Sequence, residues 1–308
     1  MRVLITGAGG NLGRALAPLL AAQGYTPVLM DLRPLDTPYD FIQADVREAD
    51  AVRRAVESAE AVVHAAALHG IHQGKWSPQD FWNINATGTF NLFEAVRERG
   101  IKRVVLCSTM GVYGESARPP QNTHTWNIVT EALPCLPTDG YGQSKHLCEE
   151  MGRYYSRQWG ITTVALRLGM FVPEPNLERY GFRLLFGGVD DRDVAQASLL
   201  ALSHVPQQSG FDFFNIMADV PFTVNDTHAL GTETAAVLER YYPGSTELFQ
   251  ARAINVSEQL WGRTIWSVEK AKHLLGYRPR FNFDGFVNAF RANDKAYYPF
   301  AGLPWWGV

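Results

Sequence analysis

The sequence predicts an α/β protein in which a doubly wound parallel sheet carries a smaller C-terminal lobe. Two observations predict this fold. In the first half of the chain, short apolar runs alternate with helical stretches, as expected for strands that are covered on both faces. A glycine-rich turn, TGAGGNLG, joins the first apolar run to the first helix. Because crossovers between parallel strands are right-handed, the doubly wound arrangement is the common outcome.

The expected elements alternate up to residue 168. Leucines recur at helical spacing after the glycine-rich turn, and β-branched residues fill the runs AVVH and RVVLC. In chain order we expect strand 2–5, helix 11–24, strand 26–30, strand 40–43, helix 49–58, strand 61–64, helix 89–100, strand 103–107, helix 144–160 and strand 162–168.

The pattern loosens after residue 168, where prolines and a Gly-Gly pair interrupt it. VDDRDVAQASLLAL is typical of a loop that leads into an Asp-capped helix, and FDFFNIM of a further strand. SVEKAKHLLG predicts a helix with Ser267 as N-cap and Gly276 just past its end.

Composition and charge exclude several classes of protein. Among 308 residues, 46% are hydrophobic and 19% charged, which is ordinary for a globular protein, and the net charge of -3 argues against nucleic-acid binding. The three cysteines lack C-x-x-C spacing, so we expect no disulfide scaffold and no metal site. Neither a signal peptide nor a membrane-spanning run is visible, and we expect a cytoplasmic protein.

The turn TGAGGNLG predicts a dinucleotide phosphate site, because it follows a strand and opens a helix. Gly7 permits the tight turn, Gly10 lets the backbone approach a pyrophosphate, and Gly13 allows close packing of helix and strand. Asn11 and Leu12 begin the helix, whose unpaired N–H groups and dipole favour an anion.

Acidic residues after the second and third strands predict the adenosine end of the site. Asp31 lies about 20 residues beyond the turn, where a carboxylate binds ribose hydroxyls and repels a 2′-phosphate, which favours NAD over NADP. Arg33 weakens that preference if it meets the phosphate. Asp45 and Val46 fit a loop that passes the adenine, although an Asp after a strand is often a helix cap.

These features divide the chain into two parts. We expect residues 1–168, with 189–217 returning to them, to form the NAD-binding domain. Residues 169–188 and 218–308 would then form a substrate-binding lobe.

Six motifs resemble those of the extended short-chain dehydrogenase/reductases, the NAD-dependent epimerase/dehydratase family, which has a Rossmann fold. They are, in order, TGAGGNLG, HAAA (64–67), NINATGTFNLFEA (83–95), STMGVYG (108–114), YGQSK (141–145) and SVEKAKHLLGYRP (267–279). Together they span most of the chain in the family's order.

The resemblance implies a role for several residues of these motifs. Tyr141 would be the general base or acid, and Lys145 would lower its pKa and bind the nicotinamide ribose. Thr109 would hydrogen-bond the reacting oxygen, and Ser108 would line the site. The remaining positions implied to lie near the cofactor are Ala65, Ala66 and Asn85.

Elementary electrostatics supports the pairing of Tyr141 with Lys145. Residues four apart on a helix share a face, and a free tyrosine, with a pKa near 10, is a poor base at neutral pH. A cation about 4 Å away, at an effective dielectric near 20, contributes roughly 4 kcal/mol, or about three pKa units at most. We therefore expect Lys145 to bring the phenol toward neutrality.

The substrate is predicted less directly. Met110 and Gly111 stand where dehydratases of the family carry Asp and Glu, which disfavours dehydration. The short segment 169–188 resembles that of uronate dehydrogenases, where an Arg grips the substrate carboxylate, so Arg179, or else Arg183, is a candidate. The uronate enzymes, however, have Asn and His at the positions of Met110 and Gly111.

The motifs allow more than one function, and a histidine in the loop after the strand 61–64 is a further candidate for a substrate contact. His69 is a candidate substrate contact, although surface histidines are common. The first hypothesis is an NAD-dependent oxidoreductase acting on a sugar-like alcohol. The alternatives are a nucleotide-sugar 4-epimerase with tightly held NAD and a non-catalytic NAD(P)-sensing regulator. The resemblance also implies a homodimer.

Overall fold

The computed structural model describes residues 1–207, 210–259 and 262–303. The strands are β1 (Arg2–Thr6), β2 (Thr26–Asp31), β3 (Asp40–Gln43), β4 (Ala61–His64), β5 (Arg103–Thr109), β6 (Asn127–Val129), β7 (Thr162–Leu168), β8 (Phe211–Ile216) and β9 (Thr264–Trp266).

The α-helices are α1 (Asn11–Ala22), α2 (Ala49–Val56), α3 (Pro78–Phe81), α4 (Gly88–Arg99), α5 (Gly140–Trp159), α6 (Leu177–Leu185), α7 (Asp191–Ser203), α8 (Ala229–Thr232), α9 (Thr234–Tyr241), α10 (Ser245–Ala251) and α11 (Phe283–Arg291). Two segments are π-helical, Trp82–Thr87 and Ala271–Leu275.

Seven parallel strands form the main sheet, in the order β3-β2-β1-β4-β5-β7-β8. The order reverses between β1 and β4, where Thr6 pairs in register with His64. In open α/β sheets, ligands bind beyond the carboxyl ends of the strands at such a switch point. The predicted doubly wound fold is confirmed.

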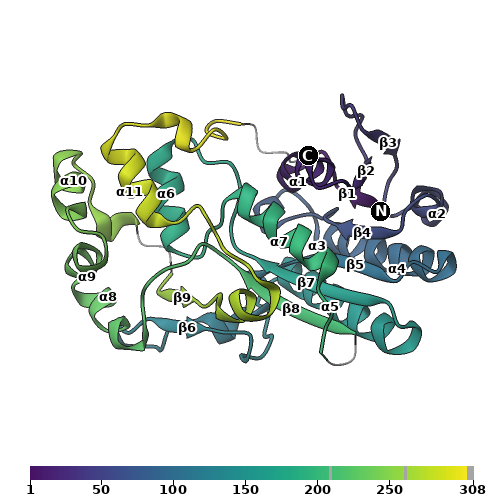
Figure 1. Ribbon diagram of the computed structural model, residues 1–308. Coiled ribbons are helices and arrows are strands. Elements are labelled where there is room, and N and C mark those ends of the chain that lie inside the picture. The colour runs from purple at the N-terminus through teal and green to yellow at the C-terminus, as the bar shows by residue number, and fades with distance from the viewer. Residues whose placement is uncertain (208–209, 260–261, 304–308) are drawn as a thin grey trace.

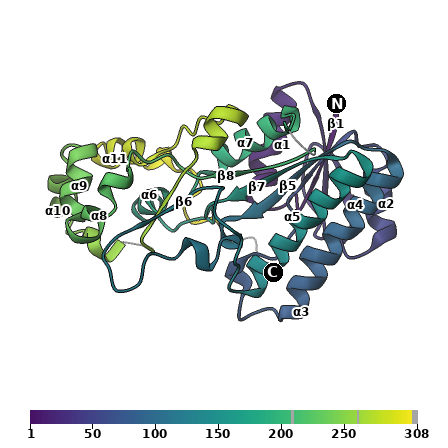
Figure 2. The same ribbon diagram turned by 90° about the horizontal axis from the view of Figure 1, so that it is seen from below.

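Helices cover both faces of this sheet. Figure 2 shows α2, α4 and α5 on one side and α1 and α7 on the other. The inner strands β1, β4, β5 and β7 are almost wholly buried because both faces are packed: one core lies under α1 and α7, and a second lies between the sheet and α2 and α4. This covering leaves the carboxyl edge of the strands as the place where loops gather.

The second part of the chain forms a lobe at one end of the molecule, where Figure 1 shows α8, α9, α10 and α11 with α6. Its core is rich in aromatic rings, with Phe182 and Phe286 among them. A small two-stranded parallel sheet, β6–β9, adjoins it.

Two segments pack across the predicted division between the domains. Trp126, assigned by sequence to the NAD-binding domain, lies in the aromatic core of the lobe, and β6 pairs with β9. Conversely, Leu275 and Tyr277, assigned to the lobe, pack in the core under α1 and α7. Long-range pairing of this kind leaves no local signal in the sequence.

Local differences from the expected elements concern helix starts and helix type. Helix α5 begins at Gly140, capped by the Asp139 side chain, so Tyr141 lies in its first turn. The predicted helix after Ser267 forms and ends at Gly276 with φ 75°, but Ala271–Leu275 is π-helical. None of the helices described here is long and apolar enough to span a bilayer.

Candidate active site

The turn between β1 and α1 and the start of that helix contain Gly7, Gly10 and Gly13, two of which have no room for a side chain. Gly7 has φ 66°, and a Cβ there would lie 2.7 Å from the backbone of Ala66. A Cβ at Gly13 would overlap the carbonyl oxygen of Ala8. A Cβ at Gly10 would meet only the carbonyl oxygen of Gly7, at 3.2 Å, so its outer side is open.

The start of α1 therefore offers a site for an anion. Gly10 is the N-cap residue, and no side chain caps the first turn of this 12-residue helix. Its first N–H groups point outward with the positive end of the helix dipole. Leu12 is buried in the core, and the Asn11 amide donates to the carbonyl oxygen of Phe171 at 3.1 Å. Asn11 thus ties the glycine turn to the segment after β7.

Asp31 ends β2 beside this turn. Its two carboxylate oxygens accept the backbone N–H groups of Gly9, at 2.9 Å, and Arg33, at 3.0 Å. The Arg33 side chain is half exposed, with Nε 3.8 Å from Asp31. The Arg33 guanidinium thus lies beside the Asp31 carboxylate, and the roles of both residues toward a ribose or a 2′-phosphate stay predictions.

The other predicted adenosine contacts follow β3 and β4. The Arg47 guanidinium donates two hydrogen bonds to Asp45, from Nε at 2.9 Å and from Nη2 at 2.5 Å. Val46 is buried against Gly88 at the start of α4. Ala65 and Ala66 follow β4, next to Gly7 across the switch point. Asp45 is thus held by its own loop rather than acting as a helix cap.

Thr109 and Tyr141 meet at the carboxyl end of β5. Thr109 is the last residue of the strand, and its hydroxyl accepts the N–H of Gly111 at 3.1 Å, which leaves its proton free to donate. It hydrogen-bonds the Tyr141 phenol from there. Lys145, one turn farther along α5, is only 3% exposed, and no carboxylate of the described residues lies within ion-pair distance of it.

The pKa of Tyr141 corrects one prediction. Burial raises it to about 12, and the hydrogen bond from Thr109 offsets that only in part. The direction is opposite to the predicted lowering by Lys145, because desolvation of a phenolate outweighs the neighbouring groups in the protein by itself.

Two histidines near Lys145 are neutral, chiefly because they are buried. Burial and this cation lower the pKa of His64 to about 3 and that of His69 to about 4. Both His64 ring nitrogens are used, by Thr6 at 2.7 Å and Thr89 at 3.0 Å, so His64 is a structural residue at the end of β4.

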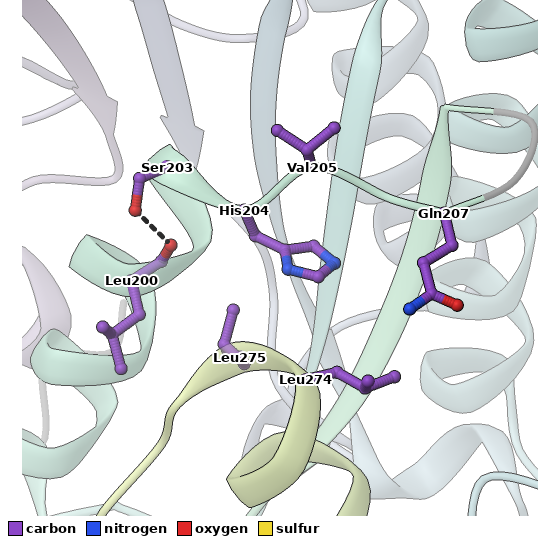
Figure 3. Close-up of a pocket in the computed structure, with 7 residues that line it drawn as sticks. All are labelled: Leu200, Ser203, His204, Val205, Gln207, Leu274 and Leu275. Atoms are coloured by element: carbon purple, nitrogen blue, oxygen red, sulfur yellow. Dashed lines mark hydrogen bonds between the residues drawn. The ribbon is translucent and has the colours of Figure 1, made fainter.

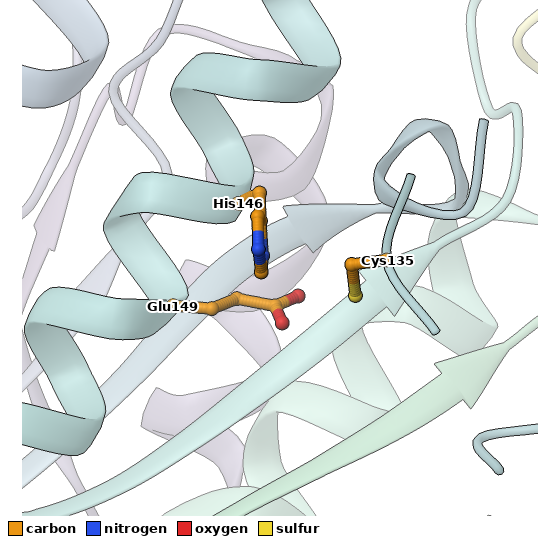
Figure 4. A group of neighbouring side chains, drawn as sticks. All are labelled: Cys135, His146 and Glu149. Atoms are coloured by element: carbon orange, nitrogen blue, oxygen red, sulfur yellow. The ribbon is translucent and has the colours of Figure 1, made fainter. Parts of the chain in front are cut away.

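The Ser108 hydroxyl faces away from Thr109 and donates to Glu149 at 2.5 Å. Glu149 also accepts two hydrogen bonds from Arg167, at 3.0 and 2.7 Å. Cys135 and His146 lie beside this carboxylate (Figure 4), with ligand atoms within 4.8 Å of one another. The Arg167 guanidinium, 3.1 Å from the Cys135 sulfur, already supplies the positive charge there, so we assign no metal.

Asn85 is a bridge rather than a free donor. Its amide nitrogen donates to Ser144 at 2.9 Å and to the carbonyl oxygen of Leu68 at 3.0 Å, and its oxygen accepts the N–H of Leu68. The π-helical turn that carries Asn85 therefore joins the loop after β4 to α5, next to Lys145.

The candidate substrate residues lie on three segments. Met110 follows Thr109 and is partly buried, and the His69 ring stacks on the Tyr141 ring with centroids 6.3 Å apart. Arg179 is half exposed on α6, 3.9 Å from Glu174. Arg183 is buried and donates to the carbonyl oxygens of Val172 and Val189, which makes it a structural residue.

Sequence reasoning missed the groups that hold the site together. Glu149 lies two turns after Tyr141 on α5, and Arg167 is a charged residue in an otherwise apolar strand, which is a recognisable sign of a buried ion pair. Phe81, whose ring contacts Tyr141 with centroids 6.3 Å apart, carried no such sign.

Comparisons with known proteins decide the family. The profile of the NAD dependent epimerase/dehydratase family matches residues 3–176, more than half of the chain. The chain belongs to this family. The match covers the glycine turn, Asp31, Thr109 and the Tyr141–Lys145 pair, and the extended short-chain dehydrogenase/reductase resemblance is confirmed.

Individual relatives are more distant. A uronate dehydrogenase of Pseudomonas syringae pv. tomato is 31% identical over 183 residues, covering 58% of this chain and 62% of its own length. A UDP-glucose 4-epimerase of Streptomyces lividans is 30% identical over 161 residues, covering 49% and 46%. The chain thus matches less than two thirds of the length of these relatives.

A solved structure extends the likeness of the fold to nearly the whole chain. A short-chain dehydrogenase/reductase superfamily protein from Agrobacterium tumefaciens, crystallised with NAD, has a TM-score of 0.71 over 96% of this chain and 98% of its own, at 24% identity. At that identity the likeness concerns the fold. The open side of Gly10, the uncapped first turn of α1 and the placement of Asp31 fit the family's cofactor, NAD.

Two surface cavities lie away from this site. One, of about 390 Å³, is lined by Ser203, His204 and Leu274 among others, between the end of α7 and the Ala271–Leu275 turn (Figure 3). The other, of about 480 Å³, adjoins Glu60 and Lys102. Both are at the amino edge of the sheet, where α/β proteins do not bind their cofactors.

The Asp31 carboxylate predicts the choice between NAD and NADP. In Asp31→Asn, loss of the charge should reduce the preference for NAD over NADP about tenfold or more, because a carboxylate repels the 2′-phosphate. Fluorescence titration with both reduced cofactors measures the ratio. Asp45→Asn is the matched control, since adenine is common to both cofactors; an unchanged ratio in Asp31→Asn contradicts the assignment.

Proposed function

We propose that this protein is an NAD-dependent oxidoreductase that acts at a secondary hydroxyl or keto carbon of a sugar or sugar-acid-like substrate. The observation that carries the proposal is the place of the Thr109 hydroxyl, the Tyr141 phenol and the buried Lys145 at the sheet edge that adjoins the glycine turn, with no carboxylate of the described residues within ion-pair distance of Lys145. A paired hydroxyl and phenol next to a cation can hold a substrate oxygen and move its proton.

Each residue has a distinct part in this chemistry. NAD, when bound, supplies the hydride acceptor and, in its oxidised form, a further positive charge. The Tyr141 phenolate takes the proton from the substrate hydroxyl, and Thr109 donates to the same oxygen and orients it. Lys145 stabilises the phenolate, which is needed because burial alone raises the pKa of Tyr141.

Two relatives support different reactions at such a site. The uronate dehydrogenase supports oxidation of a sugar acid, for which Arg179 on α6 is the candidate carboxylate partner. The UDP-glucose 4-epimerase supports a second candidate, epimerisation with tightly held NAD. The matched family profile ends at residue 176, before α6, so the substrate is a proposal from this chain's own residues.

Substitutions at the carboxyl end of β5 test the assignment. Tyr141→Phe should lower kcat at least about a hundredfold because it removes the proton acceptor, and Thr109→Val should lower kcat/KM strongly. Ser108→Ala is the matched control: its hydroxyl serves Glu149, so activity should persist although stability falls. NADH absorbance with a panel of sugars and sugar acids measures turnover, and full activity of Tyr141→Phe contradicts the proposal.

The amount of NAD that stays bound during purification distinguishes the two candidate functions, dehydrogenase and epimerase. A dehydrogenase must exchange NAD at each turnover, so protein purified by gel filtration should release most of its cofactor. A stoichiometric amount of NAD in the denatured supernatant would instead favour the epimerase. Epimerisation causes no net redox change, so that outcome calls for product analysis of nucleotide sugars.

The protein's assembly and location stay predictions. We propose a homodimer through α4 and α5, where Phe90 and Tyr154 are exposed apolar residues. Light scattering should give twice the mass of the 34.4 kDa chain, and a clean monomer mass contradicts it. A cytoplasmic location is consistent with Cys107, Cys135 and Cys148, which are all free thiols.

A further inference from the structure

Two ring N–H donors in the loop after β4 lack a hydrogen-bond partner. They are Nε2 of His72, a residue that is 6% exposed, and Nε1 of Trp76. Leaving a buried donor unpaired destabilises the folded state, so such groups in folded proteins usually have a partner from water or a ligand. Because two unpaired donors lie in one short loop, we expect one ligand or one group of waters to account for both.

The loop itself fixes His72 as a donor. The backbone N–H of His69 donates to His72 Nδ1 at 2.9 Å, so Nδ1 carries no proton. Burial, with the nearby Lys75 cation, lowers the pKa of His72, so the ring is neutral at pH 7 and its single proton is on Nε2. Trp76 can only donate. Both groups are therefore neutral donors that require an acceptor.

The same loop lies against the reacting phenol. The His72 ring meets the His69 ring edge-on at 6.0 Å, and the His69 ring stacks on Tyr141 at 6.3 Å. The backbone of Gly70 approaches so closely that a Cβ there would lie 3.2 Å from Tyr141 Cδ1. The backbone N–H of Trp76 in turn donates to the carbonyl oxygen of His72 at 3.1 Å, which ties the second donor to the first.

We propose that His72 Nε2–H and Trp76 Nε1–H form a substrate subsite that binds hydroxyl or carboxylate oxygens of the sugar. The inference rests on the proposed function, since it takes the ligand to be the molecule that reacts at Tyr141. On the other side of the site, Met110 and Gly111 follow Thr109 and offer no side-chain donor. An oxygen-rich substrate therefore finds its specificity-determining donors in this loop.

The His72 ring allows a matched pair of variants. In His72→Asn, the amide oxygen replaces Nδ1 and still accepts the N–H of His69, but the Nε2 donor is lost. In His72→Gln, the amide nitrogen lies near the place of Nε2 and keeps a donor. Trp76→Phe keeps the apolar ring and removes only the N–H. None of these residues is part of the Thr109–Tyr141–Lys145 group.

Steady-state kinetics on the full chain tests the subsite, with D-glucuronate, D-galacturonate, D-galactose and L-arabinose as probes. We expect His72→Asn and Trp76→Phe each to raise KM for the best probe about 3- to 10-fold, with kcat and the Kd for NADH nearly unchanged. His72→Gln should recover part of the loss. If KM rises for the two uronates alone, the subsite binds a carboxylate oxygen. If KM rises for all four probes, the subsite binds a hydroxyl oxygen.

Failure of the inference differs from failure of the proposed function. If the wild type turns over a probe but the variants keep its KM, the donors hold an ordered water only and the inference is wrong. If the wild type neither turns over nor binds any probe in a thermal-shift titration with NAD, both are wrong. Variants that do not fold are recognised by a lowered melting temperature. If the His72 variants do not fold, the KM of Trp76→Phe, which preserves the aromatic ring, decides the test.

Discussion

The buried ion pair between Glu149 and Arg167 fixes α5 on the sheet, and the position of the groups for which we propose a catalytic role depends on it. The two side chains are 0% and 3% exposed, and they are joined by two hydrogen bonds and by the Ser108 hydroxyl. The desolvation of such a pair is offset only when the geometry is this complete, and loss of one partner costs about 3–5 kcal/mol. The pair joins α5, β5 and β7 at one point.

Tyr141 and Lys145 lie on the same helix, within two turns of that pair. Their placement against Thr109 at the end of β5 therefore follows from a contact that takes no part in the reaction. Asn85 adds a second tie, because it joins the loop after β4 to Ser144. The Asn85 hydrogen bonds thus connect the loop that carries His69 to α5, the helix that carries Tyr141.

Lys145 lies one turn after Tyr141 on α5 and is buried. Burial, with a smaller contribution from this ammonium, lowers the pKa of His64 and of His69, so both rings are neutral at pH 7. The raised pKa of Tyr141 is consistent with a base that becomes effective only when further positive charge enters the site. The protein by itself holds the reacting phenol in its protonated form.

Local patterns were sufficient for the order of strands and helices and for the family, because each motif is written in a short stretch of chain, and they were also the source of the proposed roles of Asp31, Thr109, Tyr141 and Lys145. Packing decided the rest. The hydrogen bond from Ser108 to Glu149 joins residues 41 positions apart, and the one from Asn85 to Ser144 joins residues 59 positions apart. The pairing of β6 with β9 spans more than a hundred positions. The direction of the Tyr141 pKa shift likewise follows from burial, which only the folded chain creates. The sequence alone therefore determined the family and the fold, because their motifs are local, and the tertiary structure decided which hydroxyls, charges and ring donors are left free for the proposed chemistry.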